Sequence, residues 1–223
     1  MAVDLEIDLG ARGTVSARLD RGRDPSCLYV LAHGAGAGMR HVFMDAICER
    51  LVARGIATFR YQFPYLERGS RRPDHATVLE EAVRAAIGTA AETAPGLPLI
   101  AGGKSMGGRM SSRAAAAAPL PGVRGLVFLG FPLHPAGKPG TTRAEHLADV
   151  TVPMLFLQGT RDGLADLALL RPVVDRLGAG GRLHVVEGAD HSFHVLVRSG
   201  RTDGEVLDEL ATAIAGFAAE TCA

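Results

Sequence analysis

The sequence predicts an α/β fold with a mainly parallel β-sheet at its centre. Six short apolar runs have the composition of buried strands, and segments with the period of amphipathic helices separate them. This alternation is typical of parallel sheets that are covered by helices on both faces. A chain of 223 residues, 47% of them hydrophobic, is long enough to bury one such core. We therefore expect a single domain over residues 1–223.

Each element has its own pattern in the sequence. Residues 3–9 and 14–19 alternate in polarity on either side of a glycine-flanked turn, which predicts an antiparallel N-terminal hairpin. The expected buried strands are residues 28–32, 56–61, 97–101, 125–129, 154–157 and 183–186. Apolar residues at helical spacing predict helices over residues 43–51, 79–87, 167–177 and 206–217. The spacings of Thr77 with Glu80 and of Thr202 with Glu205 indicate capping boxes at two helix starts.

Charge and cysteine content exclude several classes of function. The 24 basic and 24 acidic residues cancel, so we expect neither nucleic acid nor a membrane surface as a partner. Cys27, Cys48 and Cys222 are too widely spaced for a disulfide framework or a zinc site. We expect a cytoplasmic protein without metal or cofactor. The observations behind this are the cysteines, the lack of any apolar run of ~18 residues and the acidic first residues.

The strongest chemical signal is G-K-S-M-G over residues 103–107, between a predicted strand and a predicted helix. In that context G-x-S-x-G forms a sharp turn that lifts the serine hydroxyl above the sheet, with glycines where a Cβ would collide. Residues 103–105 also look like the end of a phosphate-binding loop. That motif requires a glycine at position 98, which is Pro98. Ser105 is therefore the candidate nucleophile.

A glycine-rich loop, H-G-A-G-A-G over residues 33–38, follows the first buried strand. It does not fit the dinucleotide-binding pattern, because Met39 and His41 stand where the third glycine belongs. Small residues in this loop let the backbone N–H of Ala35 approach a reacting carbonyl, and the N–H of Met106 supplies a second donor. These two amides form the candidate oxyanion hole, and we expect a structural role for His33.

Two further strand ends carry an acid and a histidine. Asp162 and His191 each follow a predicted buried strand. A serine hydroxyl needs an imidazole to accept its proton, and the imidazole needs a carboxylate to orient it. Because the carboxyl ends of parallel strands meet at one edge of a sheet, we expect Ser105, Asp162 and His191 to converge there. The alternatives that remain open are Asp166 or Asp190 as the acid and His194 as the base.

With these motifs in place, the sequence resembles an α/β-hydrolase. More narrowly, it is similar to the small lidless dienelactone-hydrolase-like branch, which includes the testis-expressed and KAT8-complex-subunit hydrolase-like domains. The resemblance covers the hairpin, H-G-A-G-A-G, G-K-S-M-G-G-R, G-T-R-D, G-A-D-H-S-F, F-R-Y-Q-F-P-Y and F-P-L-H. It implies the α/β-hydrolase fold with Ser105 as nucleophile, Asp162 as orienting acid and His191 as base. Dienelactone hydrolases proper use a cysteine nucleophile, so their substrate is not carried over to this chain.

Two loops beside the expected site hold candidate substrate contacts. His134 follows the strand at 125–129 and is either a substrate contact or an exposed loop histidine. Arg60, near the end of the strand at 56–61, is a candidate contact for an acidic substrate together with Arg68, Arg71 and Arg72, and solvated arginines are the alternative that the Arg-rich composition favours. Only residues 132–142 stand where many esterases and lipases insert a helical cap, so we expect a shallow open site with no cap domain.

The sequence thus predicts a serine hydrolase that cleaves an ester, thioester or similar acyl bond of a small molecule through an acyl-enzyme. Two other functions are compatible with the same residues. One is an acyltransferase with an acceptor other than water, and the other is a non-catalytic binding or scaffold module with a hydrolase fold. The complete set of serine, aspartate, histidine and glycine elements favours catalysis, because a binding module has no need of a strained turn.

Overall fold

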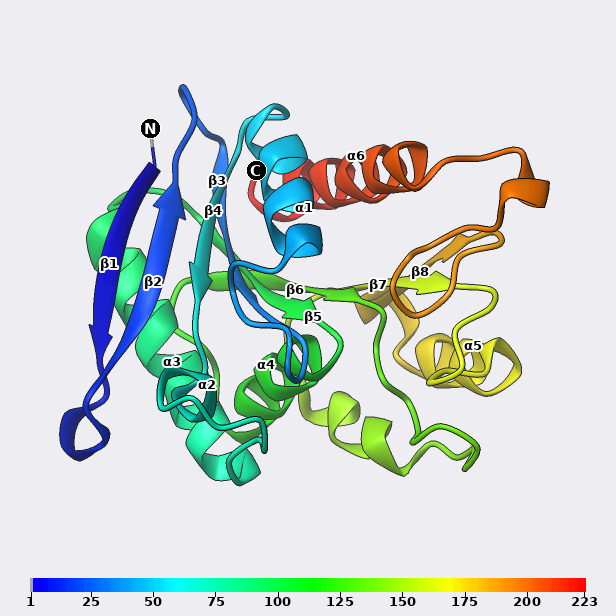
Figure 1. Ribbon diagram of the computed structural model, residues 1–223, viewed down its shortest axis with the longest axis horizontal. Helices are drawn as coiled ribbons and strands as arrows, with labels where there is room; N and C mark the ends of the chain where they lie inside the picture. The colour runs from blue at the N-terminus through cyan, green and yellow to red at the C-terminus, as the bar shows by residue number, and fades with distance from the viewer. Residues whose placement is uncertain (1) are drawn as a thin grey trace.

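The structure is a computed structural model that describes residues 2–223, with one eight-stranded sheet between two layers of helices (Figure 1). The strand order is β1-β2-β4-β3-β5-β6-β7-β8. β1 (Ala2–Asp8) and β2 (Thr14–Asp20) form an antiparallel hairpin, and β2 also pairs antiparallel with β4. The remaining neighbours in the sheet are parallel, so the predicted hairpin and the predicted parallel sheet are both confirmed.

The elements after the hairpin alternate between strand and helix. The parallel strands are β3 (Cys27–Ala32), β4 (Ile56–Tyr61), β5 (Leu99–Lys104), β6 (Val123–Leu129), β7 (Met154–Gly159) and β8 (Gly181–Val186). The α-helices are α1 (Val42–Val52), α2 (Pro64–Glu67), α3 (Ala76–Thr93), α4 (Met106–Ala117), α5 (Leu167–Arg176) and α6 (Asp203–Thr221). Short 3-10 segments are η1 (Gly10–Arg12), η2 (Thr142–Asp149), η3 (Gly178–Gly180) and η4 (Val197–Ser199).

The sheet separates two hydrophobic clusters. In β3, Leu28 and Val30 belong to the cluster that contains residues of α3, α4 and α5, whereas Tyr29 and Leu31 belong to the cluster that contains residues of α1 and α6. Figure 1 shows α1 and α6 on one face of the sheet and the other long helices on the opposite face. Because both faces of the central strands are covered, their residues are mostly apolar instead of alternating in polarity. Among the described residues no helix is both long enough and apolar enough to cross a membrane.

One of the two predicted capping boxes is confirmed and the other is wrong. Thr202 and Glu205 form the expected box at the start of α6. α3 begins earlier than expected, at Ala76 after the N-cap His75, so Thr77 lies inside the first turn and its hydroxyl faces His75 Nδ1 at 3.1 Å. Sequence spacing alone did not distinguish the cap position from the first turn of the helix.

β5 continues through Gly102, Gly103 and Lys104, beyond its expected end at residue 101. Gly102 and Gly103 have φ angles of +139° and +137°. A Cβ on Gly102 would lie 1.9 Å from the carbonyl oxygen of Val127, and one on Gly103 would lie 2.1 Å from that of Ala32. Only glycine allows so close an approach of β3 and β6 to β5. Glycine is a poor strand former, and for that reason the apolar pattern predicted too short a strand.

His33 follows β3 and is fully buried. Its Nδ1 donates to the carbonyl oxygen of Gly34 at 2.7 Å, and its Nε2 accepts from the backbone N–H of Phe63 at 3.0 Å. Burial lowers the pKa of His33 to about 4, although the Gly34 bond opposes this shift. The neutral ring therefore connects the glycine loop after β3 to the chain after β4, as expected of a structural histidine.

The first prediction concerns the packing of α4 on the sheet. A Cβ on Gly107 would lie 2.4 Å from the carbonyl oxygen of Ala32, whereas one on Gly216 in α6 would meet no atom within 4 Å. Gly107→Ala should lower the free energy of unfolding by about 3 kcal/mol, because backbone must move to admit the methyl group. Gly216→Ala should raise it by about 0.5–1 kcal/mol through helix propensity. Urea unfolding of both variants checks this, and equal effects would contradict the packing argument.

The second prediction concerns acid stability. The folded protein takes up a proton at His33 only near pH 4, whereas the unfolded chain does so near 6.5. The stabilisation linked to His33 is therefore complete above pH 6.5 and is lost as the pH falls toward 4. Unfolding free energies measured across this interval should fall by up to ~3 kcal/mol on account of this residue. His33→Gln should flatten the slope, and an unchanged slope in that variant would assign the effect to other groups.

Candidate active site

Three polar side chains meet at the carboxyl edge of the sheet. Ser105 follows β5, Asp162 lies beyond the end of β7, and His191 lies in the loop after β8. The Nε2 atom of His191 is 2.8 Å from Ser105 Oγ, and its Nδ1 is 2.7 Å from Asp162 Oδ2. The structure thus brings together in one hydrogen-bonded chain the three residues that the sequence singled out as nucleophile, acid and base.

The backbone at Ser105 is strained. Its φ of 50° and ψ of −115° lie in a region that residues with a Cβ rarely adopt. The Ser105 N–H donates to the carbonyl oxygen of Leu129 at 3.1 Å, which fixes the turn against the end of β6. Close packing at Gly103 and Gly107 on either side holds this conformation. The turn presents the serine hydroxyl to His191 in the manner of a nucleophile elbow.

The carboxylate of Asp162 is almost completely buried and is oriented by three donors. Its Oδ1 accepts from the backbone N–H of Leu164 at 2.7 Å. Its Oδ2 accepts from His191 Nδ1 and also from the side-chain amide of Gln158. Sequence reasoning missed Gln158, although a polar residue in an otherwise apolar strand four residues before Asp162 was a usable signal. With every donor in place, the carboxylate is held in one orientation toward the imidazole.

The alternative acids and the alternative base have other partners. Asp166 caps α5 by accepting from the N–H of Ala168 at 2.8 Å. Asp190 accepts from the backbone N–H groups of residues 192 and 194 and thereby shapes its own loop. His194 forms an exposed pair with Asp203, whose carboxylate raises the pKa of that imidazole. None of these side chains is hydrogen-bonded to the ring of His191 within residues 2–223.

A cavity of about 340 Å³ adjoins Ser105 and His191. Its lining combines apolar side chains with basic ones and contains no carboxylate. The lining residues are Gly34, Ala35, Ala37, His41, Phe43, Met44, Lys104, Ser105, Leu164, His191 and Ser192. The segment 132–142 contains no helix before η2, so no cap domain is inserted at this position.

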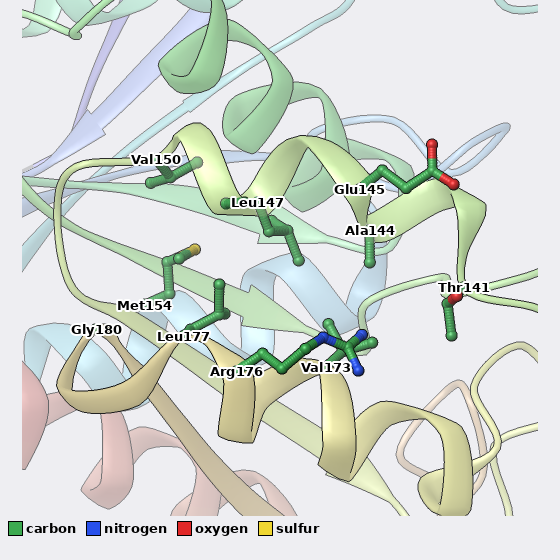
Figure 2. A pocket seen from close by; sticks show the side chains of 11 residues that line it. Thr141, Ala144, Glu145, Leu147, Val150, Met154, Val173, Arg176, Leu177 and Gly180 are labelled. Atoms are coloured by element: carbon green, nitrogen blue, oxygen red, sulfur yellow. The ribbon is translucent and has the colours of Figure 1, made fainter.

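A larger groove of about 540 Å³ lies between η2 and α5 (Figure 2). Apolar side chains including Leu147, Val150 and Met154 line it, with Glu145 and Arg176 as its charged residues. No serine, cysteine or histidine is among its lining residues. The hydrogen-bonded Ser105–His191 pair borders the smaller cavity and not this groove.

The structure does not bring Arg60 to the Ser105 cavity. Its guanidinium is buried, donates to Asp20 Oδ2 at 3.0 Å and to the carbonyl oxygen of Met39 at 3.2 Å, and pairs with Asp45. It therefore connects β4 to β2 and α1. The expectation that Arg60 contacts substrate is not supported, because its guanidinium is already paired with two carboxylates.

His134 is also occupied by backbone groups. Its Nδ1 donates to the carbonyl oxygen of Pro135 at 3.0 Å, and its Nε2 accepts from the N–H of Asp166 at 3.0 Å. The backbone N–H of His134 donates to the carbonyl oxygen of Leu164. The buried ring thus joins the loop after β6 to the segment that follows Asp162, and it does not line the Ser105 cavity.

A second serine–histidine hydrogen bond occurs elsewhere, between Ser112 Oγ in α4 and His146 Nε2 in η2, at 2.8 Å. By contact alone it has the elements of a nucleophile and a base. Ser112 is completely buried, however, and its Oγ also donates to the carbonyl oxygen of Arg109. Burial and two nearby arginines lower the pKa of His146 to about 4. Within residues 2–223 no carboxylate is bonded to the His146 ring, so this pair lacks both access and an orienting acid.

The family profile described as "Alpha/beta hydrolase domain" matches residues 25–219 of this chain. Dienelactone hydrolase from Anabaena variabilis superposes with a TM-score of 0.81 at 18% identity, over 99% of this chain and 98% of that one. A serine hydrolase without lid from Xanthomonas campestris gives 0.71 at 21% identity, over 96% and 94%. Est1E from Butyrivibrio proteoclasticus gives 0.72 at 16% identity, over 98% of each chain.

At these identities the structural likeness establishes the fold, which is the α/β-hydrolase fold in a small lidless form. The sheet order, the antiparallel hairpin and the helices on both faces agree with that fold. Since the family match extends over most of the residues, the chain belongs to the alpha/beta hydrolase domain family.

Proposed function

We propose that this protein is a serine hydrolase that cleaves an ester, thioester or similar acyl bond of a small molecule. The observation that carries the proposal is the continuous hydrogen-bonded chain from Ser105 Oγ through the His191 ring to Asp162. A serine hydroxyl is a weak nucleophile by itself, and this arrangement provides the base and the orienting acid that it needs.

Each of the three residues has a definite step. His191 Nε2 removes the proton of Ser105 as Oγ attacks the acyl carbon, and Asp162 stabilises the resulting imidazolium. The imidazolium then donates its proton to the leaving group, and an acyl-enzyme remains on Ser105. The same imidazole next deprotonates a water molecule, which attacks the acyl carbon. The imidazolium then returns that proton to Ser105 Oγ as the bond from Oγ to the acyl carbon breaks, which releases the acid and restores the serine hydroxyl. Asp162 keeps Nδ1 protonated throughout, so Nε2 is the nitrogen that exchanges protons.

The backbone N–H groups of Ala35 and Met106 are the donors for the oxyanion. Met106 is the first residue of α4, and an N–H at that position has no acceptor within its own helix. In the glycine loop, Gly36 donates to the Tyr65 hydroxyl at 3.1 Å and Ala37 donates to Gly34. The N–H of Ala35, by contrast, takes part in no hydrogen bond within residues 2–223. Two free amides beside the nucleophile are suited to the negative charge that develops in the transition state.

The cavity favours a small acyl compound over a long-chain lipid. Its volume of about 340 Å³ is modest, and no cap is present to cover a long apolar chain. One structural neighbour, Est1E, has been solved with ferulic acid bound, which is a small molecule. For the present chain we infer a substrate of comparable class, bound at the cavity beside Ser105.

The third prediction tests the nucleophile. Wild-type protein incubated with a fluorophosphonate should gain one adduct on Ser105, because His191 activates that hydroxyl. Ser105→Ala should form no adduct and should lower turnover of short acyl esters by roughly 10³-fold or more. The matched control is Ser112→Ala, which removes the other histidine-bonded serine and should still form the adduct. Labelling that disappears in Ser112→Ala and persists in Ser105→Ala would overturn the assignment.

The fourth prediction tests the acid. Asp162→Asn should lower the labelling rate by about 10³-fold, because an amide cannot stabilise the imidazolium and favours the wrong tautomer. Asp166→Asn is the control, since asparagine caps a helix as well as aspartate does and Asp166 contacts no part of the triad. Its rate should stay within about twofold of wild type. Intact-mass time courses measure both rates, and equal losses in the two variants would contradict the role of Asp162.

A further inference from the structure

The cavity beside Ser105 contains one cation that the proposed mechanism does not use, the ammonium group of Lys104. Lys104 is the last residue of β5 and directly precedes Ser105. Its Nζ donates to the backbone carbonyl oxygen of His191 at 2.5 Å. The residue next to the candidate nucleophile is therefore bonded to the backbone of the candidate base, across 87 positions of sequence.

Two aromatic rings lie beside this ammonium group. Phe43 from the first turn of α1 and Phe193 from the His191 loop are stacked, with centroids 5.9 Å apart and 14° between their planes. Lys104 Nζ is 5.8 Å from the first centroid and 5.4 Å from the second. A cation in contact with ring faces is stabilised electrostatically. Lys104 thereby links β5, α1 and the loop that carries His191.

The His191 loop has local strain that requires support. Phe193 has a φ of +64°, an uncommon conformation for a bulky side chain. The Asp190 carboxylate bonds two backbone N–H groups of the loop and fixes its internal shape. Those bonds do not connect the loop to β5, which ends at Lys104. The bond from Lys104 to His191 makes that connection.

The ammonium and imidazole groups border the same small space at the end of β6. A Cβ on Gly130 would lie 3.2 Å from Lys104 Nζ and 3.4 Å from His191 Nδ1. Burial lowers the pKa of Lys104 to about 8, while the negative charges of Asp162 and Asp190 oppose this shift. The other ionisable side chains at the cavity are those of His191 itself and of His41 at the start of α1.

We propose that Lys104 is a positioning residue for the base: its ammonium group holds the His191 loop against β5, so that the imidazole stays within hydrogen-bonding reach of Ser105. This role rests on the proposed function. A charged donor bonds a carbonyl oxygen more strongly than a neutral amine does, and only the cation is attracted to the ring faces. The loop is therefore held less firmly once Lys104 loses its proton, and the enzyme loses activity on the alkaline side.

The test is the rate of fluorophosphonate reaction at Ser105 from about pH 6 to about pH 10, measured for wild type, Lys104→Met and Lys104→Arg. The wild-type rate should fall near pH 8, where Lys104 deprotonates. Lys104→Met should react about tenfold more slowly at neutral pH, as expected for loss of a charged hydrogen bond, and should show no fall near pH 8. Lys104→Arg keeps its charge throughout, so it should recover part of the rate and lack the fall.

A second measurement reads the lysine directly. The sequence contains two lysines, and Lys138 is exposed in the loop over 132–142. NMR titration of the side-chain signal of Lys104, assigned by its loss in Lys104→Met, should give a midpoint near pH 8. A Lys104 midpoint at the ordinary lysine value of about 10.4 would overturn the alkaline part of the proposal.

The outcomes separate this proposal from the proposed function. A folded Lys104→Met protein that reacts like wild type at every pH would overturn the positioning role, while the wild-type adduct on Ser105 would leave the hydrolase assignment standing. No adduct on folded wild type would overturn both. Circular dichroism reports whether each variant is folded. If Lys104→Met does not fold, the same measurement is made on Lys104→Gln, which keeps a neutral hydrogen-bond donor. A pH profile like that of wild type in Lys104→Gln would overturn the proposal.

Discussion

The close approach of β3 and β6 to β5 is the constraint on which the candidate site depends. Gly102, Gly103 and Gly107 lie where a Cβ would be less than 2.5 Å from backbone atoms of the neighbouring strands. With no side chains between them, the strands and α4 pack backbone against backbone, and the turn at Ser105 has no room to relax. The positive φ of Ser105 is thus imposed by its surroundings, and the strain is balanced by packing that is distributed over the core.

Around that turn, buried polar groups are used as internal connections. His33, His134 and Arg60 have no free role at the cavity, because backbone groups or carboxylates bond both ring nitrogens of each histidine and both terminal nitrogens of Arg60. These connections fix the loops that follow the strands, where regular secondary structure supplies no hydrogen bonds. The polar groups that remain available at the cavity are the Ser105 hydroxyl, Nε2 of His191 and the backbone N–H groups of Ala35 and Met106. A rigid set of loops around a small reactive group suits catalysis that depends on preorganised geometry.

The sequence predictions that failed did so for physical reasons. Arg60 looked like a substrate contact because a charged residue stood near a strand end, but its carboxylate partners come from β2 and α1, which are distant in sequence. His134 was expected at the cavity by the same logic, whereas its ring accepts from the segment after Asp162. Lys104 and Gln158 were not singled out at all. Lys104 contacts His191, which lies 87 residues away and comes within reach only in the folded chain. Gln158 lies four residues before Asp162, but only the fold directs its amide toward that carboxylate.

The amino-acid pattern alone determined the elements and their order, because apolar runs, helical spacing and glycine turns encode local structure. It also determined Ser105, Asp162 and His191 as candidates, since each follows a strand whose carboxyl end must lie at the same edge of a parallel sheet. Tertiary structure decided which acid is bonded to the imidazole, which histidines and arginines are occupied, and how far β5 extends. Those outcomes depend on contacts between segments far apart in the chain, and a hydrogen bond or a missing Cβ at such a contact leaves no periodic signal in the sequence.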